Sequence, residues 1–225
     1  MYVNRNYQGS INCIQSTLKF ITENSDTNKV APNQMNEILL LMIRNYERLG
    51  QYKEGLKFYN KNKKKIADKC EAYDLEGRIY KALDNEEKSV QAYEALLDLN
   101  PANIDTYYKL INAKGIALTK DADQELSADE QAKIKETLLY YEDKYRRVGA
   151  HMRISIRHLQ GEDFSETLRR YTKPMMIKGV PSMLQDLREL YTNSDKIERI
   201  YNVLNDCLTS MEKEMTLSPS EDEEE

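Results

Sequence analysis

The sequence predicts an all-α fold, a right-handed α-solenoid of tetratricopeptide-like helix pairs. The main observation is a pattern that occurs twice, at an offset of 34 residues, between Leu41 and Pro101. The positions that repeat are Leu41, Arg44, Tyr46, Leu49 and Tyr59, which return as Leu75, Arg78, Tyr80, Leu83 and Tyr93. The composition agrees, because only 8 Gly and 5 Pro interrupt a chain of 225 residues, of which 32% are charged.

Small residues occupy the positions where paired helices would cross most closely. These are Gly55, its equivalent Ser89, and Gly77 on the helix before Ser89. With no Trp and only 3 Phe, the 16 Tyr carry most of the aromatic packing, and Tyr59 and Tyr93 hold large core positions. A Tyr ring can be buried while its hydroxyl reaches water at the edge of a thin two-layer stack. Two unrelated helical hairpins that align by chance are the alternative interpretation.

The first expected helix spans Asn6–Asn24 and places Ile11, Ile14 and Leu18 on one stripe. It has the character of the second helix of a pair whose first helix is missing. We therefore expect this apolar patch to be uncovered and to favour self-association. After a polar segment, a helix over Met35–Leu49 is apolar nearly all round, which indicates burial on more than one side.

Later helices follow the repeat and then depart from it. They are expected from Gln51 onward, over Glu71–Lys81, over Glu86–Leu99 and from Ile104 onward. After a polar insert, Ser127 and Glu130 have the spacing of a capping box, which predicts a new helix reaching about Arg147.

The remaining helices are expected over His151–Leu159, from Gly161 onward, over Ser182–Tyr191 and over Asp195–Glu214. Pro174 is expected to stop or kink the helix that begins at Gly161. These elements predict four segments: a half repeat with a linker (1–34), regular tetratricopeptide repeats (35–117), degenerate helical repeats (118–211) and an acidic disordered tail (212–225).

The tail holds most of the net charge. The chain carries a formal charge of -5, and the stretch from Glu212 to Glu225 is strongly acidic, so the rest is nearly neutral. Ser220 precedes three acidic residues, a context that casein kinase 2-like kinases favour, and Ser218 precedes Pro219. Both serines are candidate phosphorylation sites, and a plain solubilising tail is the alternative.

The sequence offers no catalytic, cofactor-binding or metal-binding residue, so no cofactor and no small-molecule substrate are expected. His151 and His158 are seven residues apart, too far for a helical metal pair, and we expect them to be surface or half-buried structural residues. Cys13, Cys70 and Cys207 share no metal spacing and indicate a reducing cytoplasmic or nuclear setting. No apolar run approaches the roughly 20 residues that span a bilayer.

A basic run is the candidate binding feature. Its lysines are Lys61, Lys63, Lys64, Lys65 and Lys69. Several ammonium groups on one helix can contact ribosomal RNA or another polyanion. A solvated helix face is the plainer interpretation of such a run.

Several segments together resemble a known family, the auxiliary subunit of the N-terminal acetyltransferase A complex. They are the repeat region, Tyr107 with Tyr108, and Leu159–Phe164. The most particular segment is the turn Lys178-Gly179-x-Pro181 followed by the helix Leu187-Arg188-x-Leu190-Tyr191, because it lies outside any generic repeat pattern. The resemblance covers about Arg5–Leu208.

The resemblance implies a non-catalytic scaffold. The family's auxiliary subunit is a long helical solenoid that wraps a small catalytic subunit, tunes its active site and tethers it to the ribosome. A cytoplasmic protein without membrane contact is the corresponding expectation. The full family protein is several times longer, so we expect this chain to correspond to an interior length.

Two other functions stay open. A generic tetratricopeptide adaptor binds a short peptide, such as a chaperone carboxyl terminus, through cationic side chains on successive first helices, and Arg44 and Arg78 recur at one such position. An enzyme built from scattered carboxylates and His151 or His158 is the other alternative.

Overall fold

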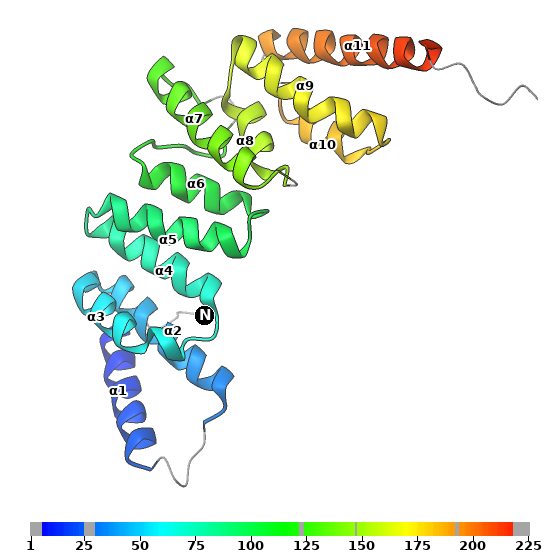
Figure 1. Ribbon diagram of the computed structural model, residues 1–225. Coiled ribbons are helices and arrows are strands. Elements are labelled where there is room, and N and C mark those ends of the chain that lie inside the picture. Colours follow the sequence, from blue (N-terminus) through cyan, green and yellow to red (C-terminus); the bar gives the residue numbers. More distant parts are fainter. Residues whose placement is uncertain (1–5, 25–29, 122–123, 147, 192–193, 218–225) are drawn as a thin grey trace, which may run out of the picture. The chain divides into compact units, whose positions relative to one another are not determined.

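The computed structural model describes residues 6–24, 30–121, 124–146, 148–191 and 194–217, with side chains described up to Glu214 (Figure 1). Within these ranges there are eleven α-helices, one short 3₁₀-helix and no strand. The predicted all-α class is therefore confirmed. The chain divides into two compact units, Met1–Ile116 and Ala117–Glu225.

The first unit contains six α-helices and the 3₁₀-helix. They are α1 (Tyr7–Glu23), α2 (Pro32–Arg48), α3 (Tyr52–Asn62), η1 (Lys63–Lys65), α4 (Lys69–Ala82), α5 (Glu86–Leu99) and α6 (Ile104–Ala113). The side chains of Asp68 and Asn85 cap α4 and α5 by accepting backbone amide hydrogen bonds. α2 begins three residues before the expected Met35, because Pro32 fits the first helical position, where no amide donor is needed.

The paired helices α4 and α5 cross where the sequence places small residues. A Cβ built on Gly77 would lie 2.7 Å from two atoms of the Tyr93 ring, so only glycine leaves room for that ring. The Ser89 hydroxyl donates a hydrogen bond of 2.9 Å to the Gly77 carbonyl oxygen. In the preceding pair, a Cβ on Gly55 would lie 3.0 Å from Tyr46 Cβ. The repeat positions therefore have the packing role that the 34-residue offset predicts.

The core of the first unit joins α2, α3 and α4. Leu40, Ile43, Leu75 and Ile79 are fully buried, and the Tyr59 ring is 1% exposed among them. The expected burial of α2 on more than one side is confirmed by its many buried residues, although Leu41 is 42% exposed.

The expectation of an uncovered patch on α1 is wrong. Ile11 and Ile14 are 1% and 8% exposed, because they pack against Met42 of α2, with Phe58 of α3 beside them. Leu18 is partly buried in the same place. The large apolar side chain that α1 does expose is Phe20, on another side of the helix.

The second unit contains α7 (Ala128–Lys144), α8 (Ala150–His158), α9 (Gly161–Ile177), α10 (Ser182–Arg188) and α11 (Ser194–Leu217). The capping box that opens α7 is present, with the Ser127 side chain and Glu130 bonding each other's backbone amides. Pro174 was expected to stop or kink this helix, and a stop is excluded, since α9 continues to Ile177. Proline lies in the last turn, where its lost hydrogen bond is offset by the burial of Leu168 and Tyr171.

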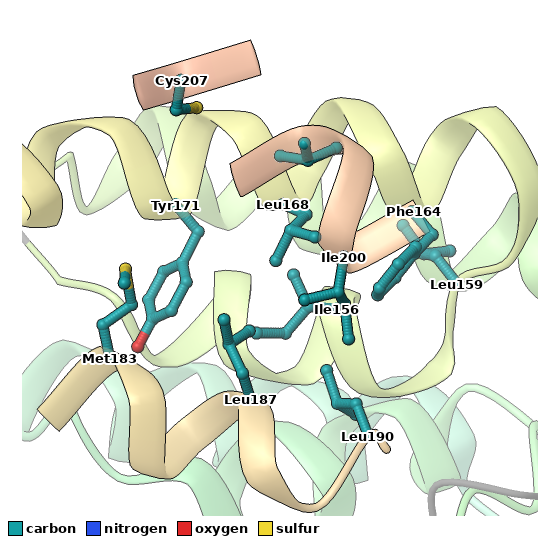
Figure 2. Close-up of a cluster of buried hydrophobic side chains, with 11 residues drawn as sticks. Ile156, Leu159, Phe164, Leu168, Tyr171, Met183, Leu187, Leu190, Ile200 and Cys207 are labelled. Atoms are coloured by element: carbon teal, nitrogen blue, oxygen red, sulfur yellow. The ribbon is translucent and has the colours of Figure 1, made fainter. Parts of the chain in front are cut away.

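Figure 2 shows side chains from α8, α9, α10 and α11 that meet in the core of the second unit. The turn after α9 sends α10 back across that core. Gly179 takes the left-handed conformation, with φ +61, and the Val180 amide donates to the Met175 carbonyl oxygen at 2.9 Å. As a result Leu187 and Leu190 are buried under α9.

α11 begins one residue earlier and ends three residues later than expected, and it buries only part of its apolar surface. Ile200, Val203 and Cys207 face α9, whereas Tyr201 and Leu208 are 69% and 50% exposed. The apolar side chains of α11 are therefore only partly covered in this unit.

We predict that Gly77→Ala destabilises the first unit, although alanine favours a helix by about 1 kcal/mol over glycine. The new methyl group would meet the buried Tyr93 ring, and overpacking of this kind costs about 1–3 kcal/mol. Chemical denaturation of the variant should show the loss, with the exposed Lys57→Ala on α3 as the control. A more stable Gly77→Ala protein would show that the helices do not cross this closely.

Candidate partner-binding surfaces

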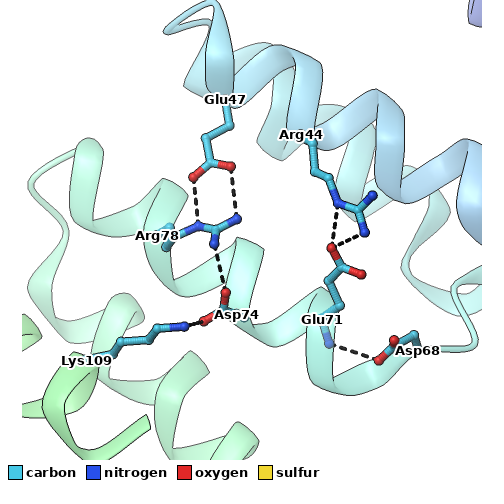
Figure 3. A network of polar contacts seen from close by, with 7 residues as sticks. All are labelled: Arg44, Glu47, Asp68, Glu71, Asp74, Arg78 and Lys109. Carbon is cyan, nitrogen blue, oxygen red and sulfur yellow. Dashed lines mark hydrogen bonds and ion pairs between the residues drawn. The ribbon is translucent and has the colours of Figure 1, made fainter. Parts of the chain in front are cut away.

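Ion pairs connect successive helices across α2, α4 and α6 (Figure 3). Arg44 of α2 donates from Nε to Glu71 Oε1 of α4 at 2.5 Å. Glu71 lies in the first turn of α4, and its own amide donates to the Asp68 cap. A carboxylate near a helix amino terminus is also stabilised by the helix dipole.

The second arginine of the repeat is held by two carboxylates. Arg78 of α4 places Nε 2.8 Å from Glu47 Oε1 and donates from Nη2 to Glu47 Oε2 at 3.0 Å. Its Nη1 donates to Asp74 Oδ2 at 2.9 Å. Lys109 of α6 donates to the other Asp74 oxygen at 2.5 Å. One continuous network therefore fixes α2, α4 and α6 to one another.

These pairs bear on the peptide-adaptor alternative. Arg44 and Arg78, which recur at one repeat position, already bind carboxylates of neighbouring helices. A peptide carboxylate would have to displace Glu71 or Glu47 from them. The network therefore serves to align helices, and the arginines do not form an open carboxylate clamp. The sequence did not reveal the partners Glu47, Glu71 and Lys109; the i, i+4 spacing of Asp74 and Arg78 was the only local sign.

The basic run ends α3, forms η1 and opens α4, and all five of its lysines are exposed. Two of them have structural partners. Lys63 lies 3.4 Å from Glu76 Oε2 and 5.3 Å from the centre of the Tyr59 ring. Lys69 donates to the carbonyl oxygens of Lys63 and Ile66 at 3.0 and 2.6 Å, which ties down the turn before α4.

The other three lysines of the run, Lys61, Lys64 and Lys65, have no carboxylate partner among the described residues. Two lysines of the basic run therefore stabilise the fold, and the other three are available to a partner.

Glu76 is a buried carboxylate beneath this run. It accepts a hydrogen bond of 2.8 Å from the Tyr59 hydroxyl. Burial, followed by the hydrogen bond to Glu76 and the charge of that carboxylate, raises the pKa of Tyr59 above its usual value, so the phenol stays protonated and keeps donating.

The two histidines lie on α8 and are more buried than expected. His151 and His158 are 1% and 2% exposed, so their prediction as surface or half-buried residues is wrong. Seven residues span two helical turns, so both rings project to the same face of α8, which is packed. Neither ring nitrogen of His151 has a hydrogen-bond partner within the described chain. Burial, followed by nearby cationic side chains, lowers the pKa of each histidine to about 4.

The remaining reactive groups are dispersed. Cys13 and Cys70 are exposed, whereas Cys207 is buried 3.9 Å from the Thr172 hydroxyl. No three His, Cys, Asp or Glu side chains come together in a metal-binding arrangement within the described ranges. In the same ranges, no helix has the length and apolar character needed to span a bilayer. The candidate phosphorylation sites Ser218 and Ser220 lie outside the described residues.

The segment around the Lys-Gly-x-Pro turn is tied to α8 by charge as well as by apolar packing. Asp186 of α10 lies 3.1 Å from Arg153 Nε and accepts a hydrogen bond from the Tyr171 hydroxyl. Glu189 forms an ion pair with Arg157. These contacts hold the segment that follows the turn against α8.

Comparison with known proteins gives consistent matches. The family described as "N-terminal acetyltransferase A, auxiliary subunit" matches residues 33–225. The "N-terminal acetyltransferase A complex auxiliary subunit NAA15" of Arabidopsis thaliana is 30% identical over 71% of the chain. The "N-alpha-acetyltransferase 16, NatA auxiliary subunit" of Mus musculus is 23% identical over 93% of the chain. The chain spans 18% and 23% of these two relatives.

A solved structure described as "Structure of Naa15/Naa10 bound to HypK-THB" is also similar. The match has a TM-score of 0.75 and 26% sequence identity, and covers 91% of this chain and 29% of the other.

We predict that Arg78→Met weakens the first unit by about 1–2 kcal/mol, because it leaves the half-buried carboxylate of Glu47 without its partner. Denaturant titration should show the loss, and added salt should reduce the difference between variant and parent. Arg146→Met is the matched control, since Arg146 and Asp143 are 80% and 78% exposed and such pairs contribute little. Equal effects of both substitutions would contradict the network.

We predict that acid weakens the second unit as the pH falls from 6.5 towards 4. The folded pKa of each histidine is about 4, below the usual 6.5, so the unfolded chain takes up the protons first. The free energy of unfolding is highest above pH 6.5. As the pH falls through 6.5 towards 4, it decreases by up to about 3 kcal/mol for each histidine. Because its ring nitrogens have no partner, His151→Leu should keep stability at neutral pH and flatten the pH dependence measured by denaturation. An unchanged pH profile would contradict the assignment.

Proposed function

The chain belongs to the family of the auxiliary subunit of N-terminal acetyltransferase A, and from this membership we propose that it is a non-catalytic scaffold for a catalytic acetyltransferase subunit. The observation that carries the proposal is the similarity, over 91% of the chain, to a protein whose structure is described as Naa15/Naa10. In that structure Naa15 is accompanied by Naa10. The proposed partner of the present chain is a catalytic subunit of the same kind.

The physical role needs no reactive group on this chain. Stacked helix pairs provide an extended surface. A partner bound along such a surface has its loops biased towards the conformation that makes better contacts, in proportion to the difference in binding free energy. The ion pairs that join α2, α4 and α6 support this role, since they keep the spacing of the surface fixed.

Association with the ribosome is the finer part of the proposal, and it includes action on nascent chains in the cytoplasm. The lysines Lys61, Lys64 and Lys65 are the candidate contact with ribosomal RNA, because they are exposed and carry uncompensated charge. Lys63 and Lys69 contribute less, since both have partners inside the first unit.

Co-expression with the organism's catalytic subunit tests the scaffold role. We expect the two chains to purify together, and we expect transfer of acetyl groups from acetyl-coenzyme A to peptide amino termini only when the catalytic subunit is present. The control is the catalytic subunit alone, whose substrate preference should differ from that of the pair. Acetyl transfer by the purified chain without any other polypeptide would overturn the proposal.

Sedimentation with ribosomes tests the lysine contact. The triple variant Lys61→Glu, Lys64→Glu and Lys65→Glu should lose most of its binding, and the binding of the parent should fall steeply with salt. The matched control reverses three other exposed lysines, Lys53, Lys81 and Lys114, and so changes the net charge equally. If both triple variants lost ribosome binding equally, net charge alone would explain the binding, and these three lysines would not be a specific contact.

A further inference from the structure

Two grooves of the first unit occupy equivalent places in successive repeats. The α1–α3 groove, with a volume of about 600 Å³, is lined by α1, α2, the end of α3 and Lys65 of η1. The α3–α5 groove, with a volume of about 340 Å³, is lined by η1, α4 and α5. The 34-residue offset relates their linings, because Leu39, Phe58 and Lys61 of the first correspond to Tyr73, Ala92 and Ala95 of the second.

The α3–α5 groove is occupied by the protein's own cations. Lys63 lies 5.5 Å from the centre of the Tyr73 ring and pairs with Glu76. Lys88 lies 5.5 Å from the centre of the Tyr80 ring. Cations placed on aromatic faces and beside a carboxylate have their charge satisfied internally. This groove therefore offers little to a partner.

The α1–α3 groove differs in both floor and rim. Its floor is apolar and consists of Leu18, Ile21, Met35, Leu39 and Phe58. Its rim is basic and consists of Lys19, Lys61 and Lys65.

The charges of this rim are largely uncompensated. Lys19 forms only an exposed pair with Glu23, at 3.8 Å, and such pairs contribute little. Lys61 and Lys65 have no carboxylate partner in the described part of the chain. The groove thus combines apolar surface with two available cations, Lys61 at the end of α3 and Lys65 in η1.

This combination selects the chemistry of the occupant. An apolar floor gains free energy by covering apolar side chains, and amphipathic helices bind such grooves through anchors at i, i+3 or i+4, and i+7. Single-stranded RNA gains less from this floor, because its bases bind by stacking on aromatic side chains. Phe58 is the single aromatic residue in the floor. The two lysines on the rim call for carboxylates beside the apolar anchors.

We propose that the α1–α3 groove is a protein-docking site for an amphipathic helix of a partner chain, with Asp or Glu residues flanking its apolar anchors. Ile21 and Phe58 bind the apolar anchors, and Lys61 and Lys65 bind the carboxylates. The site goes beyond the scaffold role proposed above and does not depend on it, since any subunit with such a helix fits.

The test uses the whole chain and a pair of designed peptides. Each peptide is an amphipathic helix of about five turns with Leu anchors at i, i+3, i+4 and i+7. One carries Glu at the flanking positions and its twin carries Lys. Fluorescence anisotropy should show the Glu peptide binding at least about tenfold more tightly.

Two substitutions on neighbouring residues of α1 test the floor. Ile21→Ser removes apolar surface from the groove and should lower the affinity for the Glu peptide by about tenfold. Phe20→Ser is the matched control, since Phe20 is 56% exposed and lies outside the groove, and it should leave the affinity unchanged. Circular dichroism verifies that both variants keep their helices.

Charge reversal tests the rim without touching the core. The double variant Lys61→Glu and Lys65→Glu should prefer the Lys peptide, whereas Lys53→Glu with Lys81→Glu should keep the original preference. Equal binding of both peptides to the parent, or no binding, would overturn the proposal.

Other occupants would also overturn the proposal. A single-stranded RNA that displaces the Glu peptide and loses its own affinity in Ile21→Ser would assign the groove itself to nucleic acid. A dimer in sedimentation that Ile21→Ser dissociates would assign the groove to a second copy. Because ribosome binding through the lysines does not require Ile21, Ile21→Ser also separates this site from the proposed ribosome contact.

Discussion

The close crossing of α4 and α5 is the constraint on which the repeat depends. Neither helix can bury its apolar face alone, so the pair must approach until the Tyr93 ring lies against the backbone at Gly77. The Ser89 hydroxyl then satisfies the Gly77 carbonyl oxygen at the same point. Once this crossing is set, the tyrosine positions become core positions, and the charged positions of α2, α4 and α6 come within reach of one another.

Charged side chains have two uses in the first unit. Arg44, Arg78 and Lys109 are paired with carboxylates of adjacent helices, so they add rigidity and leave little free charge. Lys61 and Lys65 stay unpaired above an apolar groove. This division suits the proposed scaffold role, because a scaffold needs both a fixed internal spacing and surfaces that remain available to partners.

Much of the fold could be predicted from the sequence. The 34-residue offset located the crossing residues Gly77 and Ser89, and the capping box at Ser127 located the start of α7. Other expectations were wrong. Ile11 and Ile14 are covered, and the two histidines are buried. Each of these depends on which neighbour supplies the packing, and that information lies far away in the chain.

The sequence by itself determined the helical class, the repeat and the family, since periodicity, capping and turn residues act over a few positions and are visible in order. Only the tertiary structure decided which charged side chains form ion pairs within the protein and which stay unpaired on its surface. Lys61 and Lys63 are two residues apart, yet one borders an open groove and the other pairs with Glu76. The physical reason is that a side chain's free energy depends on its spatial neighbours, and helices of different repeats supply them.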